Sequence, residues 1–441
     1  MFFKGRNTLM KRVKSAVALG LSALMTASLA ACGGSASSTS ATSAASSAGS
    51  TSAASSGTEA AASSSSTAAA SSTSTAAASS TSAAAGSGEV VDDGPGEGVH
   101  VFMFKSTGNT FGDLMYEGFS EYMHGIGEKT TYQSPAETTV AAQVQMLDEL
   151  ITQGVASITI STNGDSGYDQ VFKKAQDAGI PIVSIDSAAS PDYRVTHINQ
   201  AETADIGSYL VQAAVLIKLG VDYPGDGKME DTLKTELEKY DGDEIKIGVL
   251  SAGIDTPVQN GWIAAMEDEL GKDMYSGKVS PDLDKKYGND DLTESTTQAQ
   301  AFVSENKDDV IISPTTIGIV AAGQVIKQTG SDICLTGLGL PSEMQSFMPT
   351  KSSDNAFDYV CPYMMLWDVI HLGAVAAAAQ KGLEDGTFDG KTGSTFQMEK
   401  FRDYDAQEYS AYDYTDGGTA VLAGTPYVFY KDNMADWVNV L

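Results

Sequence analysis

The sequence predicts an α/β protein with two doubly wound, Rossmann-like lobes, preceded by a signal peptide and a disordered linker. Three observations support this prediction. Short apolar runs alternate with amphipathic helical segments from residue 99 onward, the alternation restarts near residue 245, and a long Ser/Ala/Thr-rich stretch precedes both. Strands that alternate with helices of about 10–15 residues are typical of βαβ units built around a parallel sheet.

The net charge and the small number of Cys and His residues argue against several classes of function. The 441 residues include 27 basic and 57 acidic side chains, which gives a net charge of −30. Such a chain repels phosphate backbones, so we expect no nucleic-acid partner. Three cysteines are too few for a disulfide-rich scaffold, and the four histidines lack metal-ligand spacing. We therefore expect no metal and no cofactor.

The first 31 residues contain the parts of a secretory signal in order. A basic stretch at 4–14 is followed by an apolar run at 16–25 that is too short to span a bilayer. The motif LAAC at 29–32 then resembles the bacterial lipobox. The resemblance implies that residues 1–31 are removed and that Cys32 is lipidated, which anchors the protein at the extracytoplasmic face of the cell membrane. The alternative is an ordinary secretory signal with an incidental cysteine.

A tether is predicted between Cys32 and the folded body. Residues 33–88 consist almost wholly of Ser, Ala, Thr and Gly, and Glu59 carries their only charge. A segment with no apolar face cannot bury enough surface to fold. We therefore expect residues 32–97 to be a disordered tether with an r.m.s. reach of about 40 Å.

Two sets of strands and helices follow. We predict strands at 99–104, 130–133, 155–160 and 181–185, and helices at 111–124, 139–153 and 168–178. In the first helix, Phe111, Leu114 and Phe119 recur at the spacing of one helical face. The second set follows a helix at 202–219 and an acidic insertion at 222–243. Its predicted strands are 245–250, 310–312, 333–335 and 359–362, and its helices are 258–270, 296–304, 317–329 and 367–381.

Polar side chains gather where these strands end. Lys105 follows the first strand, Asp186 follows the fourth, and Gln259 comes shortly after the strand at 245–250. In open parallel sheets, ligands bind beyond the carboxyl ends of the strands. Neutral donors and acceptors with one or two charges and aromatic rings suit a polyhydroxylated ligand, since each hydroxyl both donates and accepts. The alternative is that these polar residues cap the following helices.

At these positions the chain resembles the type I sugar-binding proteins of ABC importers, in the subgroup of rhamnose-binding and furanosyl autoinducer-binding proteins. The matching stretches, within residues 99–383, are FKSTGN at 104–109, QVQMLDELITQG at 143–154, IDS at 185–187, INQ at 198–200, YGNDD at 287–291, SPTTIG at 313–318, TGLG at 336–339 and LWD at 366–368. The resemblance implies the type I periplasmic binding protein fold. Its first lobe would be 98–200 and 336–368, its second lobe 201–335 and 369–441, with a three-strand hinge between them.

The same resemblance implies that Lys105 and Asp186 contact the ligand from the first lobe, and that Gln259, Pro314 and Thr316 contact it from the second. With neighbouring strand-end residues, the predicted ligand-binding set is Lys105, Asn109, Phe111, Ser161, Asp186, Gln200, Gln259, Asn260, Trp262, Pro314, Thr316 and Asp368. Two positions depart from the autoinducer receptors. Val258 stands where they have an aspartate, and Thr316 stands where they have a small apolar residue.

The predicted function is that of a monomeric substrate-binding lipoprotein that captures a monosaccharide-like ligand and delivers it to an ABC permease. A receptor that senses such a ligand is the alternative. An enzyme is disfavoured, because the GDSG string at 164–167 lies in a strand-to-helix loop and no nucleophile–base pair is evident. The polar strand ends disfavour a purely structural surface lipoprotein. The sequence leaves open whether Cys334 and Cys361 form a disulfide.

Overall fold

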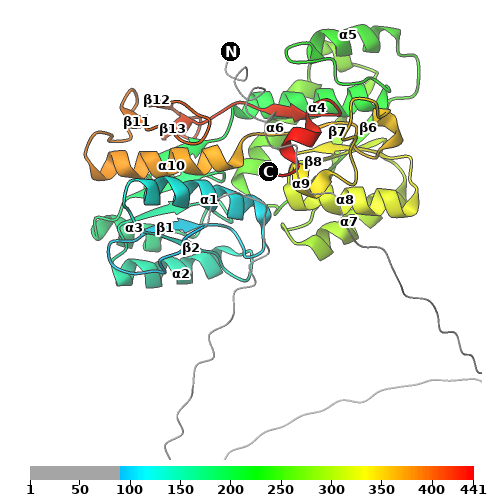
Figure 1. Ribbon diagram of the computed structural model, residues 1–441. Helices are drawn as coiled ribbons and strands as arrows, with labels where there is room; N and C mark the ends of the chain where they lie inside the picture. The colour runs from blue at the N-terminus through cyan, green and yellow to red at the C-terminus, as the bar shows by residue number, and fades with distance from the viewer. Residues whose placement is uncertain (1–89) are drawn as a thin grey trace, which may run out of the picture. The chain divides into compact units, whose positions relative to one another are not determined.

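The computed structural model describes residues 90–441, and Figure 1 shows their arrangement. The predicted signal peptide, Cys32 and the predicted tether up to residue 89 lie outside the described residues. Within the described part of the chain, none of the helices combines the length and the apolar character of a membrane span.

The first lobe is built on a sheet whose parallel part contains the predicted strands. β1 (His100–Met103), β2 (Thr130–Gln133), β3 (Ser157–Ile160), β4 (Ile182–Ile185) and β5 (Thr196–Asn199) pair in the order β2-β1-β3-β4-β5. The intervening helices are α1 (Thr110–Gly125), α2 (Val140–Gln153) and α3 (Asp169–Asp177). The helices and strands predicted here are confirmed to within a few residues.

The alternation of side chains along β1 divides the core of this lobe into two layers. Val101 and Met103 pack with apolar residues of α2 and α3, among them Leu147 and Phe172. Phe102 belongs to the apolar cluster that contains the buried residues of α1. Successive strand side chains point to opposite faces, so a sheet covered by helices on both sides requires a continuous apolar run.

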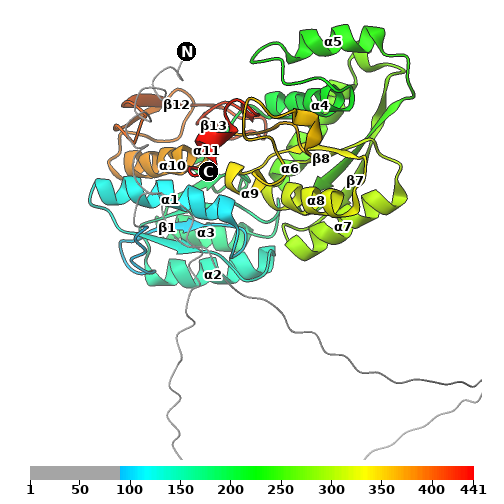
Figure 2. The same ribbon diagram turned by 45° about the vertical axis from the view of Figure 1, so that its right-hand side comes forward.

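The second lobe has a parallel sheet in the order β7-β6-β8-β9. Its strands are β6 (Ile245–Ser251), β7 (Val279–Tyr287), β8 (Val310–Ser313) and β9 (Cys334–Gly337). Its main helices are α4 (Thr203–Lys218), α6 (Pro257–Leu270), α7 (Leu292–Glu305) and α8 (Thr316–Thr329). α4 packs against α6, and α7 packs against α8, so each pair of helices forms a layer beside the sheet (Figure 2).

The predicted division of the chain after residue 335 is wrong. β9 pairs with β8 of the second lobe, and β10 (Met364–Leu366) pairs with β14 (Tyr427–Phe429) and bridges to Leu338 just after β9. By contrast, α10 (Val369–Glu384) packs along α1, and β13 (Thr419–Leu422) pairs with β5. Residues 336–368 therefore join the second lobe and residues 369–422 join the first. An apolar pattern predicts that a segment is buried, but it does not reveal the sheet edge with which the segment pairs.

Other elements also differ from the expectation. The strand expected at 359–362 lies instead at β10, and β11 (Thr395–Met398) and β12 (Gln407–Asp413) extend the first sheet beyond β13. The acidic insertion contains α5 (Met229–Lys239), which packs on α4. α5 buries Met229, Leu233 and Leu237, which recur every four residues on one helical face. Cys334 and Cys361 are both free thiols.

α1 and α10 approach each other closely at two glycines. A Cβ atom at Gly118 would lie 1.8 Å from the carbonyl oxygen of Ile370, and one at Gly373 would lie 1.8 Å from that of Met115. Since non-bonded carbon atoms normally stay about 3.5–4.0 Å apart, only glycine permits this spacing. The contact fixes α10 on the first lobe, where it lies along α1 (Figure 1).

We predict that Gly373→Ala lowers the free energy of unfolding by about 1–3 kcal/mol or more, because the added methyl group forces the two helices apart. Gly125→Ala, at the end of α1, is the matched control, since a Cβ atom there meets nothing within 4 Å. Urea unfolding followed by circular dichroism measures both variants. Equal stability of the two variants would contradict the close helix contact.

Candidate functional site

Strand ends from both lobes surround one cavity. It comprises about 330 Å³ of space outside the protein atoms, counted to its open mouth. Residues at or after the ends of β1 and β4 line it from the first lobe, and residues near the ends of β6 to β10 line it from the second. The lining residues are Phe104, Lys105, Asn109, Phe111, Asp186, Gln259, Trp262, Asp290, Pro314, Thr315, Thr316, Leu338, Leu366 and Trp367.

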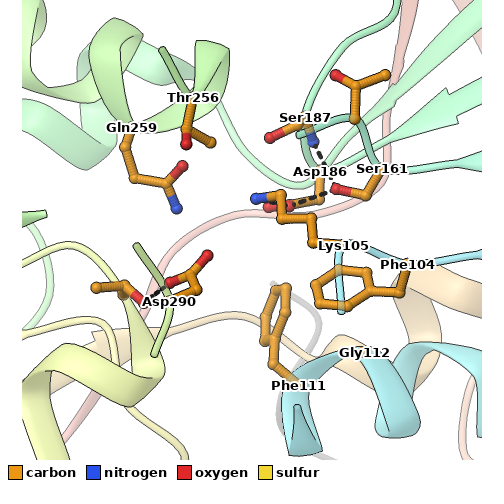
Figure 3. A network of polar contacts seen from close by, with 12 residues as sticks. Phe104, Lys105, Phe111, Gly112, Ser161, Asp186, Ser187, Thr256, Gln259 and Asp290 are labelled. Carbon is orange, nitrogen blue, oxygen red and sulfur yellow. Dashed lines mark hydrogen bonds and ion pairs between the residues drawn. The ribbon is translucent and has the colours of Figure 1, made fainter. Parts of the chain in front are cut away.

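A buried ion pair forms the polar wall of the first lobe. Lys105 Nζ lies 2.9 Å from Asp186 Oδ2, and both side chains are 3% exposed. Ser161 Oγ donates to the same carboxylate oxygen at 2.9 Å and accepts from the Ser187 N–H at 3.3 Å (Figure 3). A buried charge persists only when counter-charge and hydrogen bonds offset its lost hydration. Lys105 and Ser161 together meet this requirement for Asp186.

The backbone at Asp186 is left-handed, with φ of 60°. Aspartate and asparagine adopt this conformation more readily than most residues, because their short polar side chains bond locally. The residue type at this strand end is therefore suited to both the turn and the ion pair.

Gln259 and Asp290 face this pair from the second lobe (Figure 3). Gln259 Nε2 donates to the Pro314 carbonyl oxygen at 3.4 Å, whereas its buried Oε1 has no hydrogen-bond partner among the described residues. Asp290 Oδ1 accepts from Thr315 Oγ1 at 2.5 Å, and no cationic side chain of residues 90–441 pairs with Asp290. The second wall thus offers an amide acceptor and a carboxylate without a counter-charge.

Aromatic rings form the apolar part of the lining. Phe111 lies edge-on to Trp367, with ring centroids 6.0 Å apart, and the centroid of Trp367 lies 5.8 Å from that of Trp262. The buried Trp367 Nε1 has no hydrogen-bond partner within the described part of the chain. Rings beside hydrogen-bonding groups suit a ligand with both C–H faces and hydroxyls, as a sugar ring has.

Most of the predicted site residues meet at this cavity. Those that line it are Lys105, Asn109, Phe111, Asp186, Gln259, Trp262, Pro314 and Thr316. Asn109 also caps α1, because its Oδ1 accepts from the N–H groups of Phe111 and Gly112. The capping alternative is therefore correct for Asn109, although the residue also lines the cavity.

Two predicted residues are buried but do not line the cavity. Ser161 lies behind Asp186 and bonds to its carboxylate. Gln200 follows β5 at the crossing between the lobes and is 1% exposed, and its side-chain amide has no partner among the described residues.

The other two predicted residues have local structural roles away from the lining. Asn260 is exposed, and its Nδ2 donates to the Ile254 carbonyl oxygen at 2.8 Å. Asp368 caps α10: Oδ1 accepts from the His371 N–H at 3.0 Å, and Oδ2 accepts from the Tyr404 hydroxyl at 2.9 Å. For Asp368, capping is the alternative that the structure supports.

Several lining residues are absent from the predicted set: Phe104, Asp290, Thr315, Leu338, Leu366 and Trp367. Asp290 comes shortly after β7, which is not among the predicted strands. Leu366 and Trp367 lie at the end of β10, which is predicted several residues too early. The rule that ligands meet strand ends finds these residues once β7 and β10 are placed correctly.

Residues 100–387 match the protein family described as periplasmic binding protein domain. Among solved structures, an ABC transporter solute-binding protein from Clostridium phytofermentans with bound L-rhamnose is 30% identical, with a TM-score of 0.68, covering 79% of this chain and 100% of that one. A sugar ABC transporter protein from Actinomyces odontolyticus is 27% identical, with a TM-score of 0.54, covering 78% and 99%.

A protein from Clostridium saccharobutylicum in complex with AI-2 has the same fold, at 22% identity and a TM-score of 0.64, covering 77% of this chain and 99% of that one. The two similar proteins at 27% and 30% identity are described as a sugar transporter and a solute-binding protein rather than as enzymes. This agrees with the expectation that the chain has no catalytic role.

We predict that Lys105→Met lowers the free energy of unfolding by about 3–5 kcal/mol, because it leaves the buried Asp186 carboxylate without a counter-charge. The double variant Lys105→Met/Asp186→Asn should recover part of this loss. Lys174→Met is the control, since Lys174 pairs with Asp148 at 2.6 Å on the surface, where such pairs contribute at most about 1 kcal/mol. Equal losses in Lys105→Met and Lys174→Met, measured by urea unfolding, would rule out the buried pair.

Proposed function

Because the chain belongs to the family of periplasmic binding protein domains, we propose that it binds a monosaccharide between its lobes and delivers it to an ABC permease outside the cytoplasm. The observation that carries this proposal is the composition of the cavity, which has hydrogen-bonding groups on two opposing walls and aromatic rings between them. The similar protein with bound L-rhamnose supports a neutral hexose or deoxyhexose as the ligand class.

The two walls supply complementary hydrogen-bonding groups. The carboxylates of Asp186 and Asp290 accept hydrogen bonds from sugar hydroxyls. The Lys105 ammonium donates a hydrogen bond to a sugar hydroxyl, and Gln259 Oε1 accepts one from another hydroxyl. Hydrogen bonds that involve a charged group contribute about 1.5–3 kcal/mol each, and neutral ones about 0.5–1.5 kcal/mol. Three or four such bonds, with ring packing, are enough for selective capture of a small sugar.

The charges of the cavity favour a neutral ligand over an anionic one. Lys105 neutralises Asp186, whereas Asp290 has only the Thr315 hydroxyl as its partner in the described structure. The whole chain adds a net charge of −30. A sugar acid or sugar phosphate would therefore meet an uncompensated negative charge in a partly dehydrated site.

Contacts from both lobes couple binding to closure of the cavity. The chain crosses between the lobes at about 200–202, 367–368 and 423–426, between elements that belong to different lobes. Three short connections permit rigid-body closure while each core stays packed. A ligand favours the closed form only through contacts that the open form lacks, and Gln259 and Asp290 would make those contacts with a ligand held by Lys105 and Asp186.

The leader sequence supports attachment of this body to a membrane. We propose that Cys32 is lipidated after removal of residues 1–31, on the ground of the LAAC motif at 29–32. The predicted end of the tether at residue 97 is too late, because Asp93 accepts from the Thr130 N–H and pairs with His124 of the first lobe. A tether that ends near residue 90 would hold a monomeric binding protein close to the permease, on the extracytoplasmic side.

We predict that L-rhamnose or another neutral monosaccharide in a panel stabilises the purified protein by about 2.7 kcal/mol at a concentration of 100 Kd.

Asp290→Asn should weaken binding of that sugar about 10- to 100-fold, since a charge-assisted bond becomes a neutral one or is lost. Asp177→Asn is the control, because Asp177 is exposed and pairs with Lys173. Thermal shift and calorimetry measure both effects. The proposal fails if no neutral monosaccharide stabilises the protein, or if Asp290→Asn binds as Asp177→Asn does.

We predict that Cys32→Ala moves the protein from the membrane fraction to the soluble fraction and removes a metabolically incorporated acyl label, because two acyl chains are needed for stable attachment and the variant carries none. Cys334→Ala is the control, since this second cysteine lies in β9. A Cys32→Ala protein that still sediments with membranes would refute the anchor.

A further inference from the structure

A cluster of three potential metal ligands lies at the amino-terminal end of β1, whereas the cavity lies beyond its carboxyl end. His100 begins β1, Glu128 lies between α1 and β2, and Glu384 ends α10. One ligand atom from each lies within 4.8 Å of the others. The three residues are far apart in the sequence, so the spacing that argued against a metal could not reveal them. Packing of α10 on α1 brings them together.

The histidine of this cluster is oriented and has a free ring nitrogen. His100 is 2% exposed, and its Nδ1 lies 2.8 Å from Ser157 Oγ. Its buried Nε2 has no hydrogen-bond partner among the described residues and lies 3.8 Å from Glu128 Oε2, which is too long for a hydrogen bond. Burial lowers the pKa of His100. In metal-binding histidines, one ring nitrogen is typically held by a hydrogen bond, and the other nitrogen binds the ion.

The cluster already attracts a cation. Lys381 Nζ lies 3.2 Å from Glu128 Oε1 and 3.0 Å from Glu384 Oε2, and it also lies 3.0 Å from Asp385. The Lys381 side chain is partly exposed and keeps Asp385 as a partner if it moves aside. A lysine ammonium satisfies the two glutamates but leaves His100 Nε2 unused, whereas a metal ion would use all three groups.

We propose that His100, Glu128 and Glu384 form a site for a divalent transition-metal ion of the Zn²⁺ type. One imidazole and two carboxylates suit such ions, which bind nitrogen and oxygen at about 2.0–2.2 Å. Ligand atoms at that distance from one centre lie within about 4.4 Å of each other. Small rotations of the half-buried Glu128 and the exposed Glu384 would therefore complete the site. Ca²⁺ and Mg²⁺ prefer all-oxygen ligands and fit this set poorly. The ion would tie the end of α10 to the start of β1.

Calorimetry and thermal shift with ZnCl₂ on the purified protein test this site. The wild type should bind one Zn²⁺ ion in this site and melt at a higher temperature, and His100→Gln should bind at least ten times more weakly. Co²⁺ absorption should show nitrogen and oxygen ligation in the wild type and lose intensity in His100→Gln. Lys381→Met should bind Zn²⁺ more tightly than the wild type, because a competing cation is removed.

A second histidine provides the matched control. His124 Nε2 lies 2.8 Å from Asp93 on the same lobe, so it tests whether any histidine beside a carboxylate accounts for the signal. His124→Gln should bind Zn²⁺ as the wild type does. Glu128→Gln, which leaves the buried His100 in place, should weaken binding as His100→Gln does. Wild-type affinity in both His100→Gln and Glu128→Gln, or equal stabilisation of the wild type by Mg²⁺, would overturn the proposal.

Discussion

The ion pair between Lys105 and Asp186 is the interaction on which the cavity depends. It joins the segment after β1 to the segment after β4, and the bond from Ser161 adds the end of β3 to the same unit. Because a buried carboxylate requires these partners, the wall has one stable arrangement. Gln259 and Asp290 of the second lobe face a fixed polar surface rather than a set of mobile side chains. The ion pair itself and the hydrogen bond from Ser161 compensate for the dehydration of Lys105 and Asp186 in the absence of a ligand.

Residues 369–422 return to the first lobe and pack on elements that flank Lys105 and Asp186. α10 packs on α1 at Gly118 and Gly373, and β13 extends the sheet from β5. Each lobe therefore contains segments from distant parts of the sequence, and only short connections join the two bodies. This arrangement allows the lobes to move as units while the residues of each wall keep their relative positions. The cluster of His100, Glu128 and Glu384 lies where α10 ends on β1, so an ion there would strengthen the same attachment.

Much of the fold could be predicted because apolar residues recur in short runs or at helical spacing. β7 could not be predicted in this way. Most residues of its sequence VSPDLDKKY are half-buried or exposed, so no apolar run marks it. It also contains Pro281, which is tolerated because β7 is an edge strand. The site was inferred from strand ends, so the unrecognised β7 concealed Asp290 and the misplaced β10 concealed Trp367. Asp368 belongs to the predicted set because capping and ligand binding use the same residue types at the start of a helix. Lobe membership of 369–422 depends on strand pairing, which the local sequence does not encode.

The most direct measurement is a crystal structure of the protein grown with the neutral monosaccharide that stabilises it most. We expect electron density for one sugar between the Lys105–Asp186 pair and Gln259, with a hydroxyl within hydrogen-bonding distance of Asp290 and a ring face against Trp262 or Trp367. A sugar bound elsewhere, or a cavity without sugar at a concentration that saturates binding in solution, would contradict the account.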